Sequence, residues 1–144
     1  MRNFARMALL VSGAFAASVG MNVARADEIV LGRNNNLPEA LFCIDDGVAD
    51  SVVDVAADVG SEGATGMLAA YLKAGVCFEF DATEHWNPNI LIPFTAHEVT
   101  YSRQIEQHPV RVISVTFEKS RDPAKVFYLV SPLAVRDPGF AHRY

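Results

Sequence analysis

The chain has 144 residues, of which 51% are hydrophobic, and its formal net charge is −5. This length suits one compact domain. The acidic balance disfavours nucleic acid and anionic membrane surfaces as partners, because like charges repel. The part that follows residue 26 is more acidic still, with 9 Lys and Arg against 17 Asp and Glu and a net charge of −8.

Residues 1–26 have the pattern of a secretory signal peptide. Arg2 and Arg6 precede an apolar stretch at 7–21, and Ala24-Arg25-Ala26 is a small-x-small cleavage motif. The apolar stretch is shorter than the roughly 20 residues of a membrane span. We expect cleavage after Ala26 and no membrane anchor afterwards, with an uncleaved anchor as the alternative. The predicted location is the bacterial periplasm or the exterior.

The next 50 residues favour helices. Residues 27–36 are polar and predict a flexible arm, and Pro38 suits the first turn of a short helix that opens a helical segment at 37–75. In residues 45–60, DDGVADSVVDVAADVG, valines recur every three or four residues, and so do aspartates. On a helix the valines would lie on one side and the aspartates on the opposite side. This period predicts an amphipathic helix that ends at Gly60.

A second helix is expected after Gly60. Ser61 can act as its cap, and Lys73 followed by Gly75 is a pair of stop signals. If Gly60-Ser61 forms a tight turn, the two helices are antiparallel neighbours and make a helical hairpin.

Cys43 and Cys77 are the two cysteines of the chain. In an exported protein an even count suggests pairing. A bridge between them closes a loop of about 35 residues and contributes roughly 4 kcal/mol to stability in the chain-entropy description. A reactive thiol or a metal ligand is the alternative, although neither cysteine has another Cys or a His within five residues.

From Val76 the hydrophobic period changes to two, which is typical of strands. In the clearest candidate, 109–118, Val110 and Val112 share one face with Ser114 and Thr116, and the alternate residues take the other. Residues 126–130 follow a polar turn and predict its hairpin partner, and residues 136–144 read as a tail. The strand candidates are 76–80, 90–94, 97–105, 109–118, 126–130 and a short one within 131–135.

This order of elements predicts an α+β fold. A helical hairpin tied by one disulfide precedes an antiparallel β-unit at 76–135, and short strands of this number curl into a small SH3-like barrel or sheet. The two parts are expected to form one compact domain.

Three segments resemble a group of short exported bacterial proteins for which no activity is known. They are Cys43, the stretch YLKAGVC at 71–77 and the stretch FYLVS at 127–131. The resemblance extends over about residues 43–135. It implies a disulfide-tied helix ahead of an SH3-like β-unit.

An aspartate face is the most conspicuous polar feature. Asp46, Asp50, Asp54 and Asp58 share one side of the predicted helix. A solvated face, a surface for a basic partner and a metal site are the three interpretations. A straight helix face does not supply the tight loop of oxygens that calcium prefers, so no metal is assigned.

A possible ligand groove is suggested by aromatic residues near the predicted strands. Trp86 lies in a polar loop, and SH3-size barrels bind peptides through aromatics on such loops. Trp86 can also fold back over the core. The candidate groove residues are Trp86, Tyr101, Tyr128 and His85.

These observations favour a non-enzymatic exported module that binds a peptide, a cell-wall fragment or a protein partner, without a cofactor. The chain has no G-x-S-x-G nucleophile motif. One alternative is a small metal-binding or hydrolytic enzyme that uses His85, His97 and nearby carboxylates. Another is an acidic inhibitor or immunity-type protein that presents Asp50, Asp54 and Asp58 to a basic target.

Overall fold

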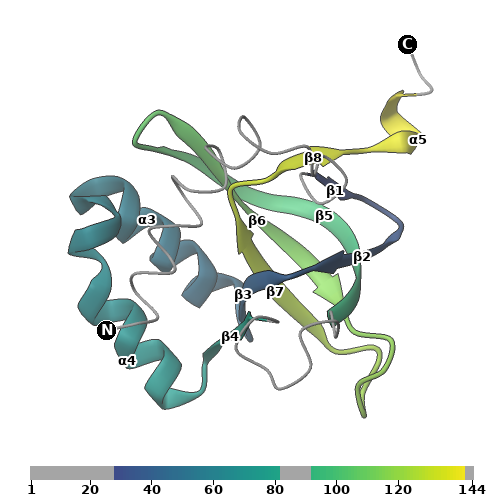
Figure 1. Ribbon diagram of the computed structural model, residues 1–144, viewed down its shortest axis with the longest axis horizontal. Coiled ribbons are helices and arrows are strands. Elements are labelled where there is room, and N and C mark those ends of the chain that lie inside the picture. The colour runs from purple at the N-terminus through teal and green to yellow at the C-terminus, as the bar shows by residue number, and fades with distance from the viewer. Residues whose placement is uncertain (1–27, 82–91, 142–144) are drawn as a thin grey trace.

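The computed structural model describes residues 28–81 and 92–141, which form an α+β fold (Figure 1). The predicted signal peptide, His85 and Trp86 lie outside these residues. The elements are β1 (Glu28–Val30), β2 (Asn34–Leu37), β3 (Glu39–Cys43), α3 (Asp46–Gly63), α4 (Thr65–Ala74), β4 (Cys77–Asp81), β5 (Ile92–Ile105), β6 (His108–Thr116), β7 (Val126–Ser131), β8 (Ala134–Arg136) and α5 (Pro138–Ala141).

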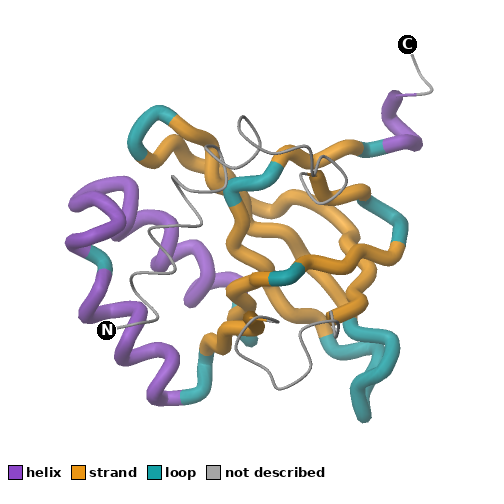
Figure 2. Tube along the Cα trace, in the orientation of Figure 1, coloured by secondary structure: helices purple, strands orange, loops and turns teal. Residues whose placement is uncertain are grey.

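Six of the strands form one curled antiparallel sheet in the order β2-β5-β6-β7-β3-β4. Strands β2 and β3 are separated by Pro38 alone, and yet β2 pairs with β5 whereas β3 pairs with β7 and β4. A bend at Pro38 therefore brings the β5 side of the sheet round toward the β3 side. The result is a half-barrel, and Figure 2 shows both long helices on one side of it.

Each side of the sheet has its own core. Helix α3 packs on the outer side of the sheet. Its buried alanines and valines form one core with Leu41, Val112 and Val130 of the strands. The inner side is filled by Leu129, Ile113 and a group of aromatic rings centred on Phe42, whose ring contacts those of Phe78, Phe94 and Phe117. Burial on both sides makes this small sheet the centre of the molecule.

A second, two-stranded sheet joins the two ends of the described chain. Strand β1 pairs in parallel with β8, and Ile29 in its middle is fully buried in the inner core. Glu28 and Arg136 close the pair with an ion pair of 2.8 Å. Both of its side chains are substantially exposed, so this ion pair contributes little to stability.

Two predictions for the N-terminal part are wrong. The segment 27–36, expected to be a flexible arm, carries β1 and β2 from residue 28 onward, because its backbone pairs with β8 and β5. The helix predicted after Pro38 is strand β3, a central strand in which residues 40–43 are all buried. A continuous apolar run suits a strand covered on both faces, and Pro38 supplies the bend that precedes it.

The two predicted helices are present, between β3 and β4 rather than ahead of all strands. Asp45 caps α3 by accepting the Val48 N–H at 3.2 Å, and Gly60 interrupts the helix at φ +84° and ψ 160°. Gly75 ends α4 in the left-handed conformation, as expected. Ser61 is not the cap of α4: its hydroxyl is buried without a hydrogen-bond partner, and the N-cap position is Ala64.

The buried face of α3 differs from the valine face that the sequence predicts. Val52 is buried as expected, but Val59 is 58% exposed because the chain kinks directly after it. The buried face is formed by Ala49, Val52, Val53 and Ala56. In the described ranges, no helix combines the length and the apolarity that a bilayer span requires.

The predicted strands 76–80, 109–118 and 126–130 correspond to β4, β6 and β7, and the hairpin of the last two is confirmed. The described part of candidate 90–94, from residue 92, and candidate 97–105 belong to a single strand, β5, which runs past two register shifts, between Ala96 and Glu98 and between Val99 and Tyr101. Such bulges let one long strand bend with the curled sheet.

Gly60 offers a direct test of the kink between the helices. Its φ and ψ values lie in a region that residues with a Cβ rarely adopt, so Gly60→Ala should lower the free energy of unfolding by about 1–3 kcal/mol. Gly66→Ala is the matched control, since Gly66 lies in α4 with nothing within 4 Å of an added Cβ. That control should be neutral or stabilising by up to about 1 kcal/mol. Equal urea midpoints for the two variants would contradict the kinked geometry.

Candidate functional site

A row of polar and cysteine side chains crosses the outer side of the sheet. Glu98 of β5 pairs with Ser114 of β6, Ser114 with Tyr128 of β7, Tyr128 with Cys43 of β3, and Cys43 with Cys77 of β4. Residues that are directly opposite in a sheet project to the same face. This row therefore lies on the face that α3 covers.

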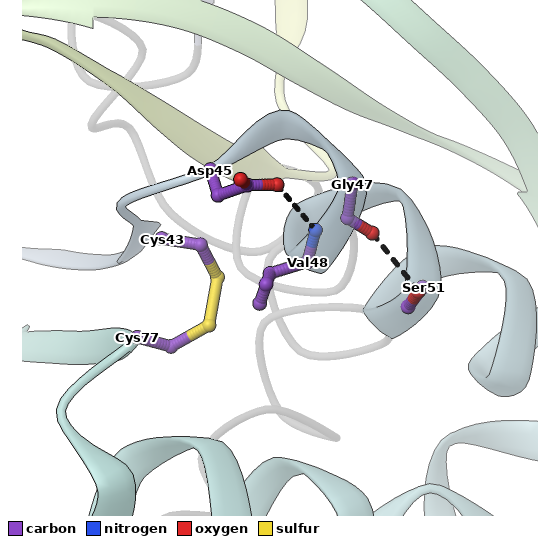
Figure 3. The surroundings of a disulfide bond; sticks show 6 residues. All are labelled: Cys43, Asp45, Gly47, Val48, Ser51 and Cys77. Atoms are coloured by element: carbon purple, nitrogen blue, oxygen red, sulfur yellow. Dashed lines mark hydrogen bonds between the residues drawn. A yellow bond between two sulfur atoms is a disulfide. The ribbon is translucent and has the colours of Figure 1, made fainter.

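The predicted disulfide between Cys43 and Cys77 is present at one end of this row, across a sequence separation of 34. Both cysteines are buried in the core under α3. Figure 3 shows the disulfide beside the first turn of α3, where the Asp45 side chain bonds Val48. The chain passes from Cys43 to the cap in two residues, so the bridge lies next to the start of the helix.

Along the rest of α3, carboxylates face β5 and β7. We call this strip the acidic seam: Asp45, Asp46, Asp50, Asp54 and Asp58 from the helix and its cap, Glu98, Tyr101 and Arg103 from β5, and Tyr128 from β7. The seam falls into two parts with different pairing.

In the paired end, β5 supplies the partners of the aspartates. Arg103 Nη1 donates to Asp54 Oδ1 at 3.0 Å, and Arg103 Nη2 donates to Asp58 Oδ1 at 3.3 Å. The Tyr101 hydroxyl also donates to Asp54 Oδ1. The hydrogen bonds from Tyr101 and then from Arg103 lower the pKa of Asp54, because they favour its charged form. The same bond from Tyr101 to Asp54 raises the pKa of Tyr101.

The open end lies at the start of α3, around Tyr128. Its carboxylates are Asp45, Asp46, Asp50 and Glu98, and within the described ranges no cation pairs with any of them. Asp45, Asp46 and Glu98 are exposed, whereas Asp50 is half-buried and its Oδ1 has no hydrogen-bond partner. Negative charge is therefore concentrated here without compensation.

The electrostatic effect of this concentration falls on Asp50 and Tyr128. Desolvation raises the pKa of Asp50, and the charges of Asp46, Asp54 and Asp45 raise it further. Burial likewise raises the pKa of the Tyr128 phenol, followed by the charges of Asp46, Asp45, Asp50 and Glu98. Burial is the larger cause of both shifts, and the neighbouring carboxylates add to it.

The structure brings together residues that the sequence suggested for separate roles. Tyr101 and Tyr128, expected in an aromatic groove, lie half-buried against the outer core beside the predicted aspartate face. That face is not simply solvated, because Asp54 is held by β5. His85 and Trp86, the other groove candidates, lie outside the described residues.

Sequence reasoning missed Arg103 and Glu98. The alternation of strand 97–105 places Tyr101 and Arg103 two residues apart on one face, which is the signal that could have paired both with a helix above. Nothing in the strand pattern alone indicates which helix face they meet.

Of the two histidines in the enzyme alternative, His97 lies within the residues that the structure describes. His97 lies in the bulge of β5, and its Nε2 is 2.8 Å from the Thr116 hydroxyl. No group of three or more His, Cys, Asp or Glu is placed to hold a metal ion in residues 28–81 and 92–141.

Comparison of the chain with models of protein families, with curated proteins and with solved structures finds no match.

The disulfide should contribute much of the stability of the domain. Replacing both cysteines with alanine should lower the free energy of unfolding by about 4 kcal/mol, because the open chain regains the entropy of a loop of this length. Urea titrations of the wild type with and without reductant provide the comparison. The reduced wild type should match the double variant, and an unchanged midpoint after reduction would contradict the assigned role.

Asp50 and Asp54 should affect stability in opposite directions. Because the folded-state pKa of Asp50 is raised, its charge destabilises the native state at neutral pH, and the wild type should gain stability from Asp50 as pH falls toward about 4. Asp50→Asn should therefore raise the Tm at pH 7 and remove this gain.

Asp54 is the matched control on the same helix. Its folded-state pKa is lowered, so it stabilises above its ordinary value of about 3.9 and loses that effect as pH falls below it. Asp54→Asn should lower the Tm at pH 7 and leave it little changed at about pH 2. Thermal melts between pH 2 and 8 measure both effects, and a shift of the same sign for both variants at pH 7 would contradict the assignment.

Proposed function

We propose that this chain is an exported, non-enzymatic binding module whose acidic seam receives a basic segment of a protein partner. The observation that carries the proposal is the open end of the seam. Four carboxylates gather around the half-buried Tyr128 without a cation, although Arg103 neutralises the other end of the same helix.

The charge of Asp50 costs stability, because burial and then the charges of the neighbouring aspartates raise its pKa. A Lys or Arg side chain from a partner would relieve the repulsion and supply charge-assisted hydrogen bonds, each worth roughly 0.2–1 kcal/mol at these exposed groups. The exposed carboxylates are accessible to such a side chain. The partner chemistry that fits is therefore basic.

This proposal unites two interpretations of the sequence. A protein-binding module and an acidic inhibitor or immunity-type protein differ in their biology but require the same surface. A cell-wall fragment or neutral peptide in an aromatic groove fits less well, because the Tyr101 hydroxyl is already engaged by Asp54.

Export supports a partner outside the cytoplasm. We propose that residues 1–26 are a signal peptide cleaved after Ala26, and that the protein works in a bacterial periplasm or outside the cell. The Cys43–Cys77 disulfide is consistent with an oxidising compartment. We also propose that the half-barrel belongs to the SH3-like class, as the resemblance to short exported bacterial proteins implies, and that α3 and α4 form a helical hairpin.

The proposal is tested with a defined basic probe. A fluorescein-labelled peptide of ten residues, rich in lysine and arginine, is titrated with the purified protein, and anisotropy reports binding. Asp46→Asn should weaken binding by several-fold, because one carboxylate of the open end is lost. Affinity should also fall between low and physiological salt, since exposed charges are screened.

Glu118→Gln is the matched control. Glu118 is an exposed carboxylate of the β6–β7 connection, so the variant removes the same charge away from the seam. Its affinity should equal that of the wild type. If Glu118→Gln weakens binding as much as Asp46→Asn, the attraction depends on net charge alone and the seam is not the site.

A further inference from the structure

A hollow of about 460 Å³ lies apart from the interface of α3 with the sheet, where three distant parts of the chain meet. Its walls are residues 31–33 between β1 and β2, His97 in the bulge of β5, and residues 137–139 after β8. This volume is in the range of sites that take small molecules or a few residues of a peptide.

The walls of the hollow are held by hydrogen bonds. The buried Asn35 side chain accepts the Val30 N–H at 2.9 Å and donates to the carbonyls of Val30 and Arg33. Gly32, which has a φ of +76°, donates its N–H to Ala96 O at 2.7 Å. These bonds tie the turn to β5, so the hollow is preorganised.

On the opposite wall, Asp137 Oδ1 accepts the Gly139 N–H at 3.1 Å and shapes the chain that enters α5. The His97 ring is oriented by the bond between its Nε2 and the Thr116 hydroxyl. Its other ring nitrogen, Nδ1, is left for a further hydrogen bond.

Arg33 is the cation of this hollow. Within the described ranges no carboxylate pairs with it, although the chain after residue 26 is strongly acidic. A guanidinium group presents a planar fork of donors that matches a carboxylate in two parallel hydrogen bonds. Leu31 and Pro138 add apolar surface beside it.

We propose that this hollow binds a ligand with a single carboxylate next to an apolar group, through Arg33 and with His97 as the second hydrogen-bonding group. A peptide C-terminus and a small organic acid share this chemistry. Arg33 supplies a single positive charge, which matches a monoanion better than phosphate. The proposal is independent of the acidic seam, which takes ligands of the opposite charge.

The test is an NMR titration of the ¹⁵N-labelled protein at pH 7. The probes are an N-acetylated tripeptide ending in leucine with a free carboxylate, the same peptide as its C-terminal amide, acetate and inorganic phosphate. We expect saturable shifts of amides in 31–33, 97 and 139 with the free peptide, and none with the amide. If acetate binds as tightly as the peptide, small acids are the source of the carboxylate; weaker binding of acetate points to the peptide terminus.

Two arginine variants complete the test. Arg33→Gln should weaken carboxylate binding by about tenfold or more, the loss of a charge-assisted hydrogen bond. Arg121→Gln, which removes an exposed charge in the β6–β7 connection, should bind like the wild type. Equal Tm values verify that both variants are folded. The proposal is overturned if the amide binds equally, if phosphate binds more tightly, if Arg33→Gln retains the affinity, or if no probe produces shifts up to on the order of 10 mM.

Discussion

The bent strand from Asn34 to Cys43 is the constraint on which the rest of the structure depends. Its first half pairs with β5 and its second half with β7 and β4, so one segment joins both sides of the curled sheet. Pro38, at the bend, has no N–H for a sheet ladder and is therefore suited to the break between the halves. If this segment were straight, β2 could not reach β5, and the aromatic core inside the curl would lose one wall.

The same strand also positions the helical layer. It ends at Cys43, which is bonded to Cys77 and lies next to Tyr128, and the cap of α3 follows two residues later. The bulges of β5 then bring Tyr101 and Arg103 beneath the middle of the helix. The acidic seam is thus a consequence of how the sheet bends, because it requires a fixed helix start and a fixed strand register.

On one helix, the acidic seam contains an aspartate whose charge is stabilised and another whose charge is destabilised. Arg103 and Tyr101 stabilise the charge of Asp54, whereas Asp50 lies one turn earlier in a site that resists its charge. In the hollow, by contrast, the charged group without an ion-pair partner in the described ranges is the cation Arg33. The bulge that bears His97 is directly followed by Glu98, so β5 contributes to both places.

The sequence by itself determined the features that depend on residues close together in the chain. The three-to-four-residue period of 45–60 identified α3, Gly60 identified its interruption and Gly75 the end of α4. The alternation in 109–118 and the polar turn after it identified the β6–β7 hairpin. The pairing of Cys43 with Cys77 followed from their number, since two cysteines allow one bridge. These features need only the backbone period and the chemistry of single residues.

Tertiary structure decided the rest, because non-local pairing overrides local preference. Residues 28–43 resemble a polar arm and a helix start, yet they become strands since β5, β7 and β8 offer them backbone partners and two buried faces. Likewise, no period in the sequence indicates that Asp54 meets Tyr101 and Arg103, 47 and 49 residues away. The free energy of such contacts depends on which faces the fold brings together. The bend at Pro38 determines which faces these are.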